Sequence, residues 1–157
     1  MTTSEITKEG KEVSLQRCQK MLKELETFPG YAVFAANWWL EKLKNPEEDI
    51  GKYHFDFIVT MPVQKRGITE KDEILFKYTL AQLIMESVKE KDFCLLYTTE
   101  AFYACPILEK AGKKIGLSPK LSYYPKSINM VVFKERIMLT IASSEETVLW
   151  AEGKSEK

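Results

Sequence analysis

Apolar side chains recur at helical or strand spacing along most of this chain, with polar runs between the patterned segments. The first pattern begins after Ser14, a residue type that commonly caps a helix, and ends at Pro29-Gly30. Residues 31–44 repeat the helical spacing up to Asn45-Pro46. Two consecutive helices, paired as a hairpin, are therefore expected near the N-terminus. The apolar face of the first is expected to comprise Leu15, Cys18, Leu22 and Leu25.

Residues 53–61 alternate between apolar and polar side chains, which is the period of a half-buried strand, and Pro62 ends this run. Thr69 and Asp72 then have the spacing of a capping box, which opens a long helix with a broad apolar stripe. Residues 93–97 have the composition of a second, mostly apolar strand. A strand, a long helix and a second strand predict a right-handed parallel crossover.

A further helix is expected from Pro106, whose fixed φ suits the first helical position, to Gly116 as its C-terminal stop. Two β-rich runs at 127–133 and 137–142 indicate a hairpin, and a short last strand is expected at 147–150. The predicted fold class is α+β. It combines an N-terminal helical hairpin, a βαβ crossover, a further helix and a C-terminal antiparallel β-hairpin in one mixed sheet.

The length of 157 residues fits one domain, and 45% apolar with 11% aromatic residues is enough to bury a core. Residues 1–12 are expected to be a flexible N-terminus, residues 13–151 a single α+β domain and residues 152–157 a flexible tail. The 23 basic and 23 acidic side chains cancel. Zero net charge argues against a generic polyanion binder, because non-specific nucleic-acid affinity depends on a surplus of Lys and Arg.

Three cysteines without a C-x-x-C pair indicate reduced thiols, not a disulfide scaffold. The N-terminal residues lack the pattern of a signal peptide, and no run approaches the roughly 18 apolar residues that a membrane helix needs. We therefore expect a cytoplasmic protein with no membrane partner. A single histidine, His54, argues against a histidine metal cluster and against a Ser-His triad. No metal, cofactor or catalytic residue is predicted, and the balance is against an enzyme.

Two polar loops would follow the predicted parallel strands, where open α/β sheets bind ligands. The first carries Lys65 and Arg66 before the long helix, whose free N–H groups and positive dipole end favour an anion. The second carries Thr98, Thr99 and Cys105, and a cysteine at a helix start can have a lowered pKa. The alternative is a solvated turn, capping threonines and an inert packing cysteine. No glycine-rich phosphate motif supports a nucleotide site.

Residues 110–136 form a basic block with a local charge of +6, because seven basic residues stand against Glu135 alone. With Tyr123 and Tyr124 among them, these residues could follow a phosphate backbone and stack on bases. The alternative is that the cations decorate different faces of a helix, a loop and a hairpin. The seven are Lys110, Lys113, Lys114, Lys120, Lys126, Lys134 and Arg136.

Aromatic residues supply a candidate interaction surface. Trp38 and Trp39 are adjacent on a predicted helix and point about 100° apart, so one of them is expected to be partly exposed. Exposed aromatic side chains are typical anchors of interfaces, although each one taken alone is more typical of a core. The candidate surface comprises Trp38, Trp39, Tyr103, Tyr123, Tyr124 and Lys126.

From residue 68 onward the chain has a helix entered by Ile68-Thr69, a helix opened by Pro106-Ile107-Leu108, and a hairpin entered through Tyr124-Pro125-Lys126-Ser127-Ile128-Asn129-Met130. In these features it resembles small uncharacterised proteins carried by bacterial phages and mobile elements. It departs from their pattern after the hairpin, where Ala142-Ser143-Ser144-Glu145 replaces a glycine-rich turn. The resemblance implies a binder or inhibitor of a host machine and transfers no site residue.

These observations favour a non-catalytic macromolecule-binding domain, an inhibitor or adaptor acting on a host protein, whose partner is another protein or a second copy of itself. The first alternative is a small anionic-ligand or nucleotide-binding protein that uses the loops after the parallel strands. The second is nucleic-acid contact through residues 110–136.

Overall fold

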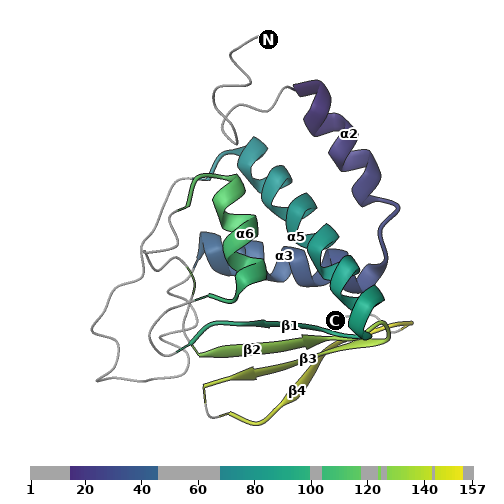
Figure 1. The fold of residues 1–157 in the computed structure, drawn as a ribbon, viewed down its shortest axis with the longest axis vertical. Helices are drawn as coiled ribbons and strands as arrows, with labels where there is room; N and C mark the ends of the chain where they lie inside the picture. Colours follow the sequence, from purple (N-terminus) through teal and green to yellow (C-terminus); the bar gives the residue numbers. More distant parts are fainter. Residues whose placement is uncertain are drawn as a thin grey trace.

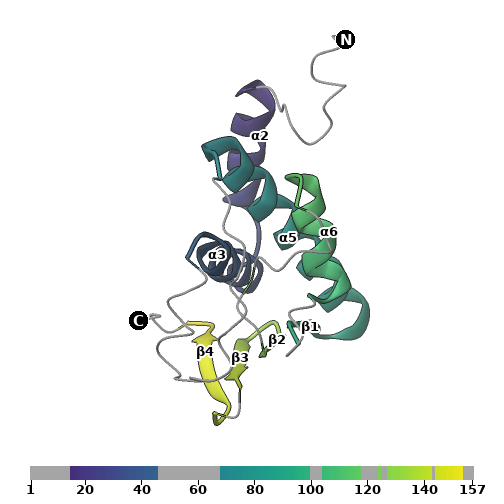
Figure 2. The same cartoon turned by 90° about the vertical axis from the view of Figure 1, so that its left-hand side faces the viewer.

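The structure is a computed structural model of the 157-residue chain, and it describes residues 15–45, 68–99, 104–117, 124, 127–142 and 144–153. Helices lie on one side of a four-stranded sheet (Figures 1 and 2), which confirms an α+β fold. In chain order the elements are α2 (Leu15–Leu25), α3 (Gly30–Lys44), α5 (Glu70–Lys91), β1 (Cys94–Tyr97), α6 (Pro106–Lys114), β2 (Ile128–Val132), β3 (Arg136–Ile141) and β4 (Thr147–Ala151).

The described strands pair in the order β1-β2-β3-β4, and every pairing among them is antiparallel. The expected mixed sheet with a parallel crossover is therefore not confirmed. The strand predicted at 53–61, which would begin that crossover, lies outside the described residues, as do the predicted flexible N-terminus 1–12 and, of the predicted tail 152–157, residues 154–157. β1 pairs antiparallel with β2 although α6 stands between them. A strand-helix-strand pattern does not fix strand direction, because a helical connection can return the chain to either end of the sheet.

Helix α3 lies between α5 and the sheet (Figure 2), and it contacts α5, β2 and β3. Its alanines at 32, 35 and 36 are fully buried, and small side chains let a helix approach its neighbours closely. The Trp39 indole N–H donates to Met130 Sδ on β2 at 3.3 Å. At the start of the helix, a Cβ added to Gly30 would stand 3.0 Å from the Trp150 ring of β4. These contacts fasten α3 to the sheet along its length.

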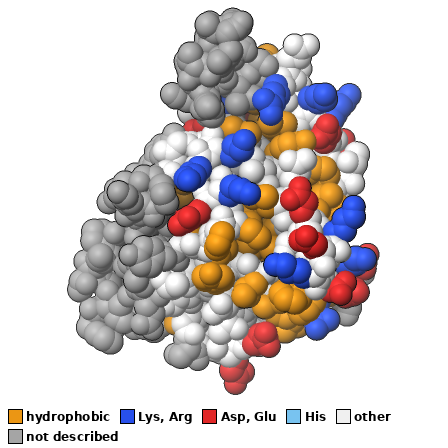
Figure 3. All heavy atoms as spheres, in the orientation of Figure 1, with side chains coloured by type: hydrophobic (Ala, Val, Ile, Leu, Met, Phe, Trp, Pro, Cys, Tyr) orange, Lys and Arg blue, Asp and Glu red, His pale blue; other side chains and the backbone are white. Residues whose placement is uncertain are grey.

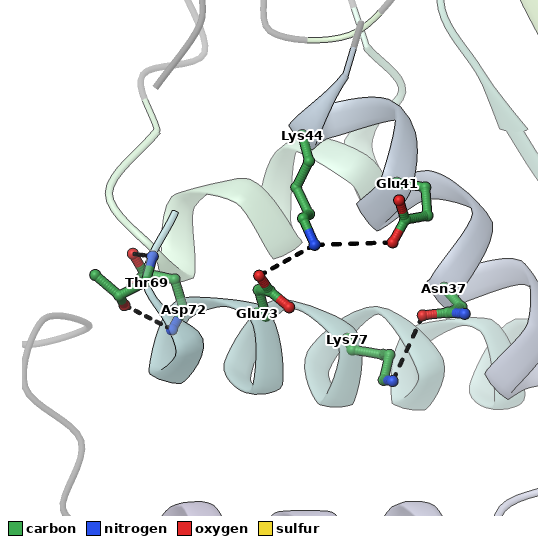
Figure 4. Close-up of polar contacts among 7 residues, drawn as sticks. All are labelled: Asn37, Glu41, Lys44, Thr69, Asp72, Glu73 and Lys77. Atoms are coloured by element: carbon green, nitrogen blue, oxygen red, sulfur yellow. Dashed lines mark hydrogen bonds and ion pairs between the residues drawn. The ribbon is translucent and has the colours of Figure 1, made fainter. Parts of the chain in front are cut away.

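Helix α5 begins with the capping box that the sequence predicted (Figure 4). The Asp72 N–H donates to Thr69 Oγ1 at 3.1 Å, and the Thr69 N–H donates to Asp72 Oδ2 at 3.2 Å. The helix ends at Asp92, whose φ of 75° is left-handed and whose N–H donates to the Val88 carbonyl at 2.8 Å. Both ends of this long helix are thus fixed by local hydrogen bonds.

Polar contacts join α5 to α3 at the surface (Figure 4). Lys44 Nζ lies 3.2 Å from a carboxylate oxygen of Glu73 and 3.8 Å from one of Glu41. Lys77 Nζ lies 3.5 Å from Asn37 Oδ1. Partly exposed pairs of this kind contribute little to stability, so the buried side chains between the helices hold them together.

Helix α2 presents a different face from the one expected. Cys18, Met21 and Leu25 are buried, whereas Leu15 and Leu22 are 63% and 43% exposed. The expected helical hairpin is also corrected, since α2 and α3 each make most of their contacts with α5 and few with one another. A helix that packs against one neighbour needs only a narrow buried face, and three residues at three- and four-residue spacing provide it.

The helix at 106–114 and the strands after it agree with the predicted segments. In the sheet, alternate side chains point toward the helices and are buried: Cys94, Leu96, Ile128, Met130, Val132, Ile137, Leu139 and Ile141. We call this the inner face. The opposite face, which points away from the helices, is called the outer face below.

Candidate interaction surface

The threonines expected at a ligand site connect β1 to β2. Thr98 is buried; its N–H donates to the Ile128 carbonyl at 2.9 Å, and its Oγ1 accepts from the Ile128 N–H at 3.1 Å. The Thr99 carbonyl accepts from the Ser127 N–H at 3.2 Å. The cations expected beside them, Lys65 and Arg66, lie outside the described residues. Because the described sheet is antiparallel, the argument for a ligand site beyond parallel strand ends loses its basis.

The cysteines have the environment of packing residues. Cys105 is 2% exposed, precedes α6 and donates its backbone N–H to the Tyr97 carbonyl at 3.0 Å. Burial raises the pKa of its thiol above the usual value, although nearby backbone groups lower it in part. Burial also raises the pKa of the Cys94 thiol to about 11, although a hydrogen bond with the Ser87 side chain lowers this pKa by a smaller amount. Thiolate is the reactive form, so neither group is prepared for nucleophilic chemistry.

The aromatic residues of the predicted interaction surface differ in burial, and some of them belong to the core. Trp39 is fully buried and Tyr124 is 7% exposed, and their rings meet edge to face with centroids 5.7 Å apart. Trp38 is half-buried, with Lys42 Nζ 5.1 Å from its ring centroid. The expectation that one of the adjacent tryptophans is partly exposed is therefore confirmed. Tyr103, Tyr123 and Lys126 lie outside the described residues.

The described members of the basic block occupy two separate elements. Lys110, Lys113 and Lys114 are on α6, whereas Lys134 and Arg136 flank the turn between β2 and β3. Figure 1 shows α6 at the left of the helical layer and this turn at the right-hand end of the sheet. Lys120 and Lys126 lie outside the described residues. The described cations therefore do not form a single continuous strip.

An apolar row crosses the outer face of the sheet from one edge strand to the other. Leu95 pairs with Val131, Val131 with Met138, and Met138 with Val148, so their side chains lie side by side on neighbouring strands. We call Leu95, Val131, Met138 and Val148 the central row. Leu95 is 43% exposed and Val148 58% exposed, and the two inner members are half-buried. Figure 3, in the orientation of Figure 1, sees the sheet nearly edge-on and shows hydrophobic side chains beside the strands, between charged side chains.

The two ends of the outer face differ in charge. Beyond one side of the central row lies Phe133, with the Arg136 guanidinium 4.4 Å from its ring centroid. Beyond the other side lie Asn129 and Thr140, which pair with each other, and then the exposed Glu145 and Glu146 before β4. The outer face is thus apolar across its middle. Arg136 at one end stands near the exposed Lys134, Glu135 and Glu152, whereas the exposed Glu145 and Glu146 make the other end anionic.

Sequence reasoning missed this surface although a signal was present. The strands around Leu95 and Val131 are nearly continuous apolar runs, a pattern typical of strands that are covered on both faces. The described helices cover one face only. The surplus of apolar outward positions becomes visible only when the register aligns them.

Within the described part of the chain, no three His, Cys, Asp or Glu side chains are grouped to hold a metal ion. Every helix described there is too short or too polar to cross a membrane. Comparison of the chain with protein-family models, with curated proteins and with solved structures finds no match.

Proposed function

We propose that this protein is a non-catalytic binding module that holds a protein partner on the outer face of its sheet. The observation that carries the proposal is the central row, in which four apolar side chains stand side by side on β1 to β4. An antiparallel sheet with one solvated face normally alternates apolar and polar residues. Contiguous exposed apolar side chains on a folded domain mark interaction surfaces.

The chemistry of the outer face favours a protein over a nucleic acid. Its middle carries no charge, and the Arg136 guanidinium beyond one side of it lies over the Phe133 ring. Nucleic-acid surfaces need several cations along one strip. Binding without catalysis also fits the protonated, buried thiols of Cys94 and Cys105. The resemblance to phage and mobile-element proteins extends the proposal to an inhibitor or adaptor of a host protein.

Photo-crosslinking in the native host tests this function. Benzoylphenylalanine in place of Val148, which is 58% exposed on the outer face, should yield one crosslinked species of defined mass. The matched control carries the same group in place of Leu15, which is 63% exposed on α2, and should yield none. Adding Met138→Lys should abolish the Val148 product. Equal crosslinking from both positions, or none from Val148, would contradict the proposal.

A further inference from the structure

We infer that the occupant of the outer face is a second copy of this chain, related by a twofold axis that runs along the central row. This inference rests on the proposed function, because it requires the outer face to bind protein. It adds the identity of the partner and the orientation in which that partner docks. The distribution of charge at the two ends of the face carries it.

Arg136 at one end of the outer face is complementary in charge to Glu145 and Glu146 at the other end, although Glu135 and Glu152 lie near Arg136, and the two ends are too far apart to pair within one chain. Arg136 begins β3, and Glu146 follows the other end of that strand across the β3–β4 turn. The register Leu139 with Thr147 places Thr140 opposite Glu146. Four residues of extended strand, about 13 Å, separate the position of Arg136 from that of Thr140. Among the described residues, Arg136 forms no ion pair.

Rotation by 180° about an axis along the central row stacks the second copy face to face on the first. Each strand then lies above the same strand of the other copy and runs in the opposite direction. The central row then packs on the central row of the other copy, apolar against apolar. Arg136 lies above Thr140 of the second copy, beside its Glu146, and the symmetry repeats this contact at the opposite end. An isologous interface thereby gains two ion pairs from one pair of residues.

The other twofold axis in the plane of the face runs parallel to the strands, and charge disfavours it. That axis would place Arg136 of each copy at the same end of the stacked sheets, offset sideways by about one strand spacing of 4.8 Å, and would bring the two acidic ends together. Like charges in direct juxtaposition suppress such an arrangement. The positions of Arg136 and Glu146 therefore select the antiparallel arrangement.

The face, and not the sheet edge, is the docking surface. The register between β3 and β4 shifts between Ile137 and Met138, so the β4 edge carries a bulge. Bulges twist an edge strand away from further pairing. At the other edge, the Tyr97 carbonyl accepts from Cys105 and the Phe93 carbonyl accepts from Ser87. Pairing with a further strand is thus restricted at both edge strands, β1 and β4.

The size of the face predicts a reversible dimer. Four strands at about 4.8 Å spacing and five residues long cover roughly 19 by 17 Å, which is less than the roughly 800 Å² per partner of a standard interface. We therefore expect a weak dimer that forms and dissociates as the protein concentration changes. Sedimentation equilibrium of the full chain from 1 µM to 1 mM should show an average mass that rises from 18.2 kDa toward twice that value.

Substitutions then identify the surface and the orientation. Val148→Lys and Met138→Lys should each abolish dimerisation, while the control Leu22→Lys, on an exposed position of α2, should leave it unchanged. Arg136→Glu and Glu146→Arg should each weaken the dimer roughly fivefold to twentyfold, from two symmetric ion pairs. The double reversal should restore it. Unchanged circular dichroism shows that each variant is folded.

Each other outcome overturns the inference. A monomer at 1 mM excludes the second copy as occupant, and a dimer insensitive to Val148→Lys uses another surface. Loss in both single reversals without recovery in the double variant excludes the antiparallel orientation. If the chain is a monomer but Val148 still crosslinks to a different protein in the host, the proposed function stands and only this inference fails.

Discussion

At the scale of single residues, neighbours in sequence have different environments. Trp38 and Trp39 are adjacent on α3, and their rings meet edge to face with centroids 5.1 Å apart. Trp39 points to the sheet and is fully buried, while Trp38 is half-buried beside Lys42. The helical step of about 100° per residue is the cause, because only one of two adjacent side chains can reach the centre of the core.

Trp39→Ala should therefore destabilise the protein far more than Trp38→Ala. We expect a loss of about 3–5 kcal/mol at position 39, from the cavity and the lost contact with Met130, and about 1 kcal/mol at position 38. Urea unfolding followed by circular dichroism measures both. Equal losses would contradict the different burial of the two indoles.

The buried thiols predict a loss of stability in alkaline solution. The Cys94 thiol titrates at about 11 in the folded chain, against an ordinary pKa of 9.0. Between these values the unfolded chain releases its proton first, so rising pH favours unfolding, by about 1 kcal/mol at pH 10. Burial raises the pKa values of Cys105 and Tyr124 too, which adds to the loss in the same direction.

Urea midpoints at pH 7.5, 9 and 10 measure this dependence. Stability should be unaffected by these groups at pH 7.5 and should fall above pH 9. Cys94→Ala removes one of the titrating groups and should make the decline shallower. A decline as steep in the variant as in the natural chain would show that other groups cause it.

At the scale of elements, local signals decide where helices begin and end. Thr69 and Asp72 exchange hydrogen bonds at the start of α5, and Gly116 follows α6 with a φ of 84°. Hydrogen bonds between near neighbours need no tertiary partner, so short sequence motifs specify them. The buried face of α2 is different, because it depends on where α5 lies.

Thr69→Ala should cost about 1 kcal/mol, since the Asp72 N–H loses its acceptor at the first turn of α5. Thr69→Ser keeps the hydroxyl and should change the free energy of unfolding by less than about 0.5 kcal/mol. Chemical denaturation of the two variants in parallel separates the cap from other effects of the position. A serine variant as unstable as the alanine variant would exclude the cap as the cause.

At the scale of the whole molecule, the helices differ in how many other elements they contact. α3 lies between α5 and the sheet, α6 contacts α5 and β1, and α2 makes its principal contacts with α5 alone. The stacking of Phe28 on Tyr78, with centroids 5.7 Å apart, and the hydrogen bond from Tyr78 to Glu24 join α2 to α5. An element with few buried contacts opens at a lower free energy than the core.

Hydrogen exchange should reveal this order. Amides of α2 are expected to exchange at least about tenfold faster than those in the middle of α3 and α5, because α2 opens without disrupting the sheet. Mass spectrometry of peptides from 15–25, 31–44 and 75–88 measures the difference. Uniform protection across the three peptides would contradict it.

The predicted segments that lie within the described residues all appear, and the assembly of the sheet does not follow the prediction. The hairpin of β2 and β3 was recognisable because Lys134-Glu135-Arg136 separates two β-rich runs. The direction of β1 was not, since pairing Cys94 with Val132 joins residues distant in the chain. Among the candidate site residues, Trp39 and Tyr124 proved to be core, and the central row was missed.

Sequence alone determined the α+β class, the starts of α5 and α6, the ends of α3 and α6, and the partial exposure of one tryptophan of the adjacent pair, whereas α2 ends at Leu25 and not at the expected Pro29-Gly30. All of these arise from interactions within a few residues, such as capping hydrogen bonds and side-chain periodicity. Tertiary structure decided the antiparallel order of the sheet, the buried face of α2 and the apolar outer face. Those features depend on which distant segments meet, and the register between strands aligns Leu95, Val131, Met138 and Val148 from separate parts of the chain.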